Sequence, residues 1–218
     1  MEIQKHKNSY SVLIPIIGII LFTILYIIAT LYYPGGSQID KNSIGFSWQD
    51  NYWCNLLNDR AINGTINTAQ PIALAAMGIL CFSLIIFWNQ FPKYTTLSNI
   101  WKYTIKFFGT GSMIIAFFLY TKYDHDLITN FASLLGLVAV VITFFALFRS
   151  RWLLLFYFGL FNTLLVLLNN FFYYNKELIY LLPVIQKVSL ASVLIWISLI
   201  CIKMFNYKPI QSKNGNYN

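Results

Sequence analysis

Charged residues are scarce in this sequence. Asp, Glu, Lys and Arg together make up 10% of its 218 residues, and just seven residues are acidic. A soluble domain carries about 25% charged residues. Apolar residues reach 58%, and in water so apolar a chain would expose large hydrophobic patches. The composition therefore argues against a soluble domain and predicts a membrane protein.

Cysteine and histidine are also rare, with three and two copies. Cys54, Cys81 and Cys201 stand far apart without a C-x-x-C pair, so we expect packing residues and no disulfide framework. Catalytic and cofactor signatures such as H-E-x-x-H, a P-loop or a nucleophile elbow are missing. The net charge is +8, but the basic residues stand singly at the ends of apolar runs. We therefore expect no nucleic-acid partner.

Six apolar runs are long enough to cross a hydrocarbon core of about 30 Å, which takes roughly 20 helical residues. They are Val12 to Tyr33, Ala69 to Trp88, Tyr103 to Thr121, Leu127 to Phe148, Trp152 to Tyr174 and Leu178 to Ile202. The runs are continuously apolar, which favours helices over barrel strands of about 10 alternating residues. The first run is too long for a signal peptide and lacks an A-x-A cleavage site, so we interpret it as a retained signal anchor. The predicted fold is an all-α six-helix transmembrane bundle.

Basic residues set the predicted orientation. Ten lie in segments on the N-terminal side of the membrane, namely Lys5, Lys7, Lys93, Lys102, Lys106, Arg149, Arg151, Lys203, Lys208 and Lys213. Four lie on the other side, namely Lys41, Arg60, Lys122 and Lys176, while Lys187 falls within the sixth run. Positive charge is retained in the cytoplasm during insertion. We therefore expect both ends of the chain to be cytoplasmic.

The predicted organisation is a cytoplasmic arm (1–10), a membrane domain (11–205) with an extracytoplasmic loop (34–68), and a disordered tail (206–218). The tight turn at Arg149 to Arg151 makes the helices around it antiparallel neighbours. Small residues at helical spacing, such as Ala73, Ala76, Gly109 and Ser112, indicate close helix packing. The preference for Lys over Arg, with much Asn, Ile and Tyr, suggests an AT-rich bacterial genome. We therefore expect a multi-pass protein of the bacterial inner membrane.

The loop carries several turn signals. Pro34, Gly35 and Gly36 predict a sharp turn after the first helix, and Asn63-Gly64 predicts another. The mixed aromatic and polar stretch 46–57 suggests a short amphipathic helix on the membrane surface. We expect Thr68 to cap the second helix, with Pro71 in its first turn.

Part of the loop sequence also resembles that of a known protein family. The pattern Tyr33-Pro34-Gly35-Gly36, then Asn51 to Leu57, then Asn63-Gly64 and Asn67, resembles a domain-of-unknown-function family of multi-span prokaryotic membrane proteins, distantly similar to the DRAM-like proteins. Members of that family often carry an Asn and a Ser-Asp/Glu-Leu-Gly run where this chain has Cys54-Asn55-Leu56-Leu57. The resemblance covers about a fifth of the chain. It implies the fold and no activity.

Three places are candidates for chemistry. Asp124-His125-Asp126 combines carboxylates and an imidazole, which together bind divalent metals, with Asp50 or Asp59 as further ligands. The alternative is that Asp126 caps the fourth helix, Asp124 favours its positive end and His125 is solvated. We favour the alternative and commit to no metal or cofactor.

Lys187 is the second candidate, because a charge within a span is costly and is often functional. The alternative places the start of the sixth helix at Pro183, so that Lys187 extends to the interface. The third candidate is a polar stripe on the fifth helix, formed by Asn162, Asn169 and Tyr173 and facing Ser189 and Ser192. Interhelical hydrogen bonding is its simpler interpretation.

These features lead to one main hypothesis and two alternatives. The main one is a non-enzymatic protein of the lipid bilayer that binds a lipid, small molecule or partner in a polar pocket on the extracytoplasmic side. The expected binding residues are Asp50, Trp53, Asn55, Asp59, Asp124, His125, Asp126, Asn169 and Lys187. The alternatives are a membrane-embedded hydrolase with a divalent metal at Asp124, His125 and Asp126, and a small-solute transporter that uses Lys187.

Overall fold

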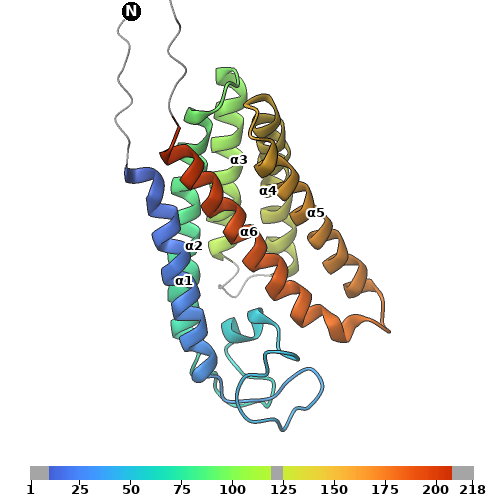
Figure 1. Ribbon diagram of the computed structural model, residues 1–218. Helices are drawn as coiled ribbons and strands as arrows, with labels where there is room; N and C mark the ends of the chain where they lie inside the picture. Colours follow the sequence, from blue (N-terminus) through green and yellow to red (C-terminus); the bar gives the residue numbers. More distant parts are fainter. Residues whose placement is uncertain (1–9, 119–124, 208–218) are drawn as a thin grey trace, which may run out of the picture.

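The computed structural model describes residues 10–118 and 125–207. Within these ranges the chain forms six α-helices (Figure 1). They are α1 (Ile14–Leu31), α2 (Gln70–Gln90), α3 (Asn99–Phe117), α4 (His125–Arg149), α5 (Leu153–Tyr174) and α6 (Leu182–Phe205). Short 3₁₀ helices accompany them: η1 (Tyr10–Leu13), η2 (Trp53–Leu57), η3 (Phe91–Tyr94) and η5 (Ile179–Leu181). The predicted all-α fold with six helices is confirmed.

Five helical segments in the described part of the chain are long and apolar enough to cross a membrane. They are Tyr10–Leu31, Gln70–Tyr94, Asn130–Arg149, Leu153–Tyr174 and Ile179–Phe205. By length and composition α3 is not among these five segments, and its first half carries Lys102 and Lys106. Nevertheless α3 packs against both α2 and α4 and belongs to the same bundle.

Successive helices run in opposite directions and pack as the hairpins α1–α2, α3–α4 and α5–α6 (Figure 1). The turn at η3, the α4–α5 turn and the last turn of α6 lie at one end, which we call the terminal end. Residues 34–68 and the α5–α6 turn lie at the opposite end, the loop end. Because α6 crosses the bundle diagonally, its last turns reach η1 and η3 while its first turns lie beside α5.

Glycines permit close approach of the helices. A Cβ added at Gly18 would lie 1.7 Å from the hydroxyl oxygen of Ser83, and one at Gly109 would lie 2.3 Å from Cδ2 of Trp88. Ser112 of α3 is buried and donates a hydrogen bond of 2.8 Å to an α4 carbonyl. The predicted close packing is therefore confirmed, and it fixes α1, α2, α3 and α4 as one tight unit.

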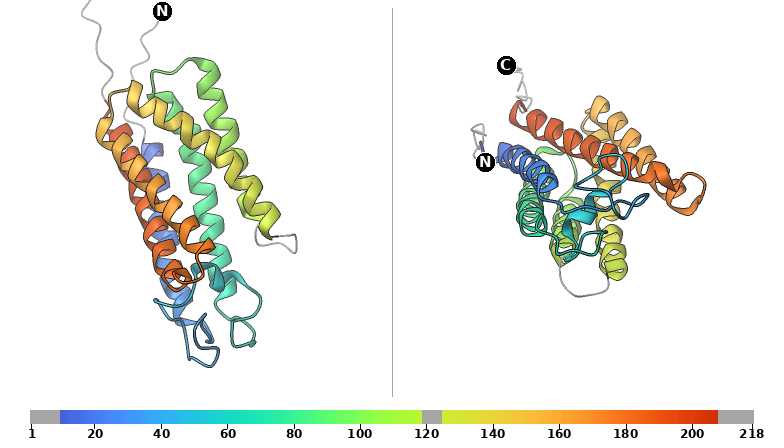
Figure 2. Two further views of the ribbon diagram at one scale, coloured as in Figure 1. Left: turned by 90° about the vertical axis from the view of Figure 1, so that its right-hand side faces the viewer. Right: turned by 90° about the horizontal axis from the view of Figure 1, so that it is seen from below.

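The α4–α5 connection is tight, as predicted. α4 ends at Arg149, α5 begins at Leu153, and Arg151 between them adopts a left-handed φ of 59°. From this turn the two helices diverge toward the loop end (Figure 2). Their separation uncovers part of α5 there.

Candidate functional site

Loop 34–68 is a folded cap on the loop end of the bundle (Figures 1 and 2). Gly36 has a φ of 83°, and a Cβ there would lie 2.4 Å from the backbone nitrogen of Asn63. Gly64 has a φ of 85° in a turn closed by the bridge between Arg60 and Ile66. Both predicted turns are confirmed, because each needs a backbone conformation that glycine adopts without strain.

Buried asparagine side chains hold the loop together. Asn51, 0% exposed, donates from Nδ2 to the carbonyl of Gly36 at 2.8 Å. Asn55 accepts from the backbone N–H of Tyr52 at 2.7 Å, and Asn67 donates to three carbonyls of residues 55–58. An amide both donates and accepts, so it satisfies backbone groups that lack a regular partner. Asn55, predicted to bind a ligand, is committed to the loop backbone.

Two local predictions about the loop are wrong. Thr68 does not cap α2; its hydroxyl donates to the carbonyl of Tyr32 at 2.6 Å, and Asn67 accepts from the N–H of Ala69. The expected amphipathic helix over residues 46–57 is reduced to η2, which packs against α2 and α6. The competing tertiary contacts outweigh the local patterns in both cases.

Lys187 fastens the loop to α6. Its ammonium donates to the carbonyl of Asn51 at 2.6 Å and to that of Pro183 at 2.7 Å, and lies 5.9 Å from the ring centre of Phe46. α6 begins at Leu182, with Pro183 in its first turn. The side chain therefore extends along the helix toward the loop end, as the interpretation with the helix start at Pro183 requires.

The neighbours of Lys187 connect the loop to α1 as well. Gln186 accepts from the backbone N–H of Trp53 at 3.3 Å, and the Trp53 ring lies 5.0 Å from that of Tyr26 on α1. Burial raises the pKa of the Cys54 thiol, while its hydrogen bond with Gln186 and the charge of Lys187 act in the opposite direction. The thiol is therefore held neutral at physiological pH.

The predicted acidic ligands do not meet within the described residues. Asp50 accepts from the Ser47 hydroxyl at 2.7 Å, and Asp59 accepts from the Gln70 amide at 2.6 Å. No group of three or more His, Cys, Asp or Glu side chains comes together in residues 10–118 and 125–207 as far as they are described. Asp124 lies outside the described residues, as do the side chains of His125 and Asp126. The metal site at these three residues stays a prediction.

A cleft of about 530 Å³ lies between α5 and α6 toward the loop end. It is lined by Val166, Asn169, Asn170, Tyr173, Leu182, Gln186, Ser189, Leu190 and Val193. Asn169 donates to the Ser189 hydroxyl across the two helices, and Ser189 donates to the carbonyl of Ile185 at 2.7 Å. The predicted hydrogen bonding between the fifth and sixth helices is therefore present. Gln186, which sequence reasoning missed, lines the cleft and also contacts the loop.

The cleft forms where α4 no longer covers the face of α5 that points into the bundle. Gly159 and Asn162 on this face are buried, whereas Val166 is 47% exposed and Tyr173 is 61% exposed. The change coincides with the divergence of α4 from α5 (Figure 2). Asn162, 4% exposed, stands one turn beyond the cleft lining, and neither polar atom of its side chain has a hydrogen-bond partner in the part of the chain that the structure describes.

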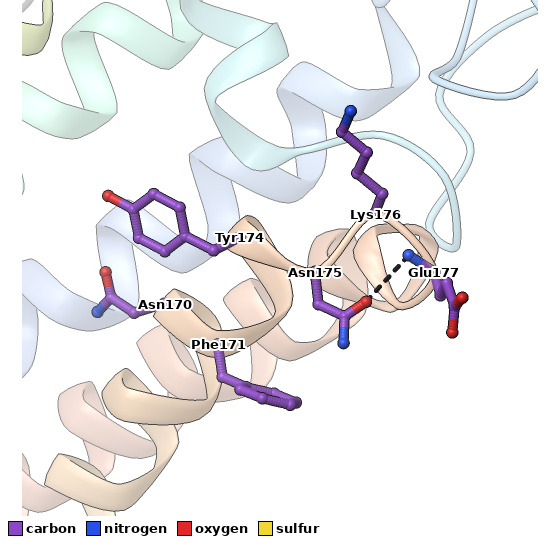
Figure 3. A pocket seen from close by; sticks show the side chains of 6 residues that line it. All are labelled: Asn170, Phe171, Tyr174, Asn175, Lys176 and Glu177. Atoms are coloured by element: carbon purple, nitrogen blue, oxygen red, sulfur yellow. Dashed lines mark hydrogen bonds between the residues drawn. The ribbon is translucent and has the colours of Figure 1, made fainter.

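A second hollow, of about 740 Å³, lies at the α5–α6 turn, where its side chains spread in different directions (Figure 3). The hydrogen bond drawn there is internal to the turn, from the Glu177 N–H to Asn175 at 3.0 Å. Asn170 lines both hollows. This hollow is thus the open surface of the turn, at the mouth of the cleft.

The five apolar segments, in an all-α bundle, fit an α-helical membrane protein. No family model, curated protein or solved structure matches this chain.

Proposed function

We propose that this is a multi-pass protein of the bacterial inner membrane that binds a lipid or lipid-like amphiphile in the cleft between α5 and α6. The observation that carries the proposal is the chemistry of the cleft wall. The wall is mostly apolar: Val166 and Val193 lie at its terminal end, the polar groups of Asn169 and Ser189 stand near its middle, and that of Gln186 lies nearer the loop end. Such a wall binds an apolar tail and orients a polar head.

Size and access support the same ligand class. Small-molecule sites have volumes of about 300–1,000 Å³ and combine apolar walls with few polar groups, and this cleft of about 530 Å³ lies within that range. Exposed Val166 and Tyr173 stand at its edge. An amphiphile enters sideways from the membrane, without crossing the loop. The described residues add no observation that favours the metal-dependent hydrolase or the transporter.

The orientation we propose places both ends of the chain in the cytoplasm and the loop outside. At the terminal end the described residues carry Lys93, Lys102, Lys106, Arg149, Arg151 and Lys203. At the loop end they carry Lys41, Arg60, Lys176 and the ammonium of Lys187, together with Asp40, Asp50, Asp59 and Glu177. In a background that lacks Cys54, Cys81 and Cys201, a membrane-impermeant maleimide should label Lys41→Cys in intact cells and Lys93→Cys only after lysis. The reverse pattern would invert the orientation.

The binding proposal is tested by the amphiphiles that stay with the purified full chain. The wild type is incubated with a lipid extract of the expression host in mild detergent, passed through size exclusion and extracted for mass spectrometry. We expect the wild type to retain one amphiphile per chain that the cleft-filling double variant Val166→Trp/Val193→Phe does not retain. Val188→Phe, on an exposed face of α6 outside the cleft, is the matched control and should keep it. Equal retention in all three proteins, or none in the wild type, would refute the proposal.

A further inference from the structure

A separate cleft lies at the terminal end, between the start of α5 and the end of α6. Its volume is about 390 Å³. It is lined by Arg151, Trp152, Leu153, Leu154, Leu155, Leu199, Ile202, Lys203 and Asn206. It shares no residue with the cleft proposed above to bind an amphiphile, here called the amphiphile cleft. On α5 the two linings end at Leu155 and Val166, and on α6 at Leu199 and Val193.

The polar part of this cleft is positively charged. Arg151 and Lys203 are both exposed, and neither side chain forms a hydrogen bond or ion pair within residues 10–118 and 125–207. The described acidic residues that could balance them, Asp40, Asp50, Asp59 and Glu177, lie at the opposite end of the bundle. α5 also begins here without a side-chain cap, so its first backbone N–H groups add to the positive potential.

The other part of the cleft is aliphatic and open. Leu154 is 82% exposed, and Leu199 and Ile202 on α6 are also exposed. Two cations therefore stand at the edge of the bundle, with an exposed aliphatic wall beside them. A phospholipid has the complementary arrangement, because its phosphate lies at the membrane surface and its acyl chains lie below it. Basic clefts between transmembrane helices on the cytoplasmic side bind anionic headgroups in this way.

We infer that this cleft is a binding site for an anionic membrane phospholipid. Arg151 and Lys203 bind the phosphate, the amide of Asn206 supplies a further hydrogen bond, and the acyl chains lie along Leu154 and the exposed face of α6. A zwitterionic lipid fits less well, because the described residues offer no carboxylate for its cationic group at this end. The inference requires that the bundle spans a membrane, but not that the amphiphile cleft is occupied.

The test is native mass spectrometry of the detergent-purified full chain, titrated with phosphatidylglycerol and, in parallel, with phosphatidylcholine. Every protein compared, including the one called wild type in this test, carries Val166→Trp/Val193→Phe, so that the amphiphile cleft is filled. The wild type should bind one phosphatidylglycerol in preference to phosphatidylcholine. Arg151→Gln/Lys203→Gln should weaken that binding roughly 25-fold, since each basic side chain near a lipid surface contributes about fivefold. The charge-preserving variant Arg151→Lys/Lys203→Arg should retain it within about threefold. If the double variant is not monodisperse, Arg151→Gln alone should lose about fivefold.

The matched control is Lys93→Gln/Lys102→Gln, which removes two charges from the same end but outside the cleft. It should leave the first phosphatidylglycerol bound as in the wild type. An equal loss in this control would mean diffuse attraction to the surface and would overturn the site. Equal binding of the two lipids by the wild type would overturn it as well.

Discussion

The contact between Lys187 and the loop yields the most exacting prediction. Lys187→Met keeps the length of the side chain and removes the donor to the carbonyls of Asn51 and Pro183. A hydrogen bond from a charged group contributes about 1.5–3 kcal/mol, and a buried acceptor left without a partner costs about 1–3 kcal/mol. Removing a half-buried ammonium recovers part of this through desolvation. We expect a net loss of about 2 kcal/mol.

The loss should be local, because the contact joins the loop to α6 and leaves the helix–helix packing intact. Hydrogen exchange with mass spectrometry measures it directly. A loss of about 2 kcal/mol corresponds to roughly 30-fold faster exchange, and we expect this in peptides covering 46–57 and not in α1. Lys176→Met, an exposed lysine at the same end, is the control. Unchanged exchange in 46–57, or the same acceleration in the control, would refute the assignment of Lys187 as the fastening residue.

Three further predictions follow from buried groups. Asn162→Leu should raise the thermal unfolding midpoint. Its reason is that the substitution removes two buried polar atoms without a partner among the described residues, which cost about 1–3 kcal/mol of folding free energy. A lower midpoint would show that Asn162 has a partner such as a bound water. Gly109→Ala should lower the unfolding free energy by about 1–3 kcal/mol, because its Cβ meets the Trp88 ring. Gly111→Ala, whose nearest contact would be 3.5 Å, should be nearly neutral in the same denaturation assay. Cys54 should be tested in a variant where it is the sole cysteine, by measuring the rate of its reaction with maleimide against pH. The apparent pKa should lie above the ordinary value of about 8.5, because burial raises the pKa of this thiol. The contribution of the Cys54 thiol to the free energy of unfolding is then complete below the ordinary pKa and falls as the pH rises through the folded-state pKa. An apparent pKa at or below the ordinary value would contradict the burial of this thiol.

Periodicity and composition predicted the helices well, because each apolar run is a local property of the chain. They also predicted the turns at Gly36 and Gly64, since positive φ angles select glycine. The pairing of Asn169 with Ser189 followed from their positions on adjacent helices. The orientation and the resemblance to a prokaryotic family stay predictions, since nothing in the structure tests them.

The roles of the loop asparagines and the position of the cleft did not follow from the sequence. Asn51 and Asn67 bond carbonyls 9 to 15 residues away, and no periodic pattern encodes such contacts. The cleft depends on where α4 diverges from α5, which is a matter of helix axes and not of residue types. One signal was present, since Gln186 and Ser189 are polar at helical spacing within an apolar run.

The fastening of the loop by Lys187 has a consequence for biosynthesis. The two bonded residues are 136 positions apart in the chain. At translation rates of about 5–20 residues per second, roughly 7 to 27 s pass between the synthesis of one and that of the other. During that interval the loop has been synthesised with its asparagine network but without the contact to Lys187. The contacts of the loop end are therefore complete only after α6 has been synthesised, so a fully fastened loop indicates that α6 is in place.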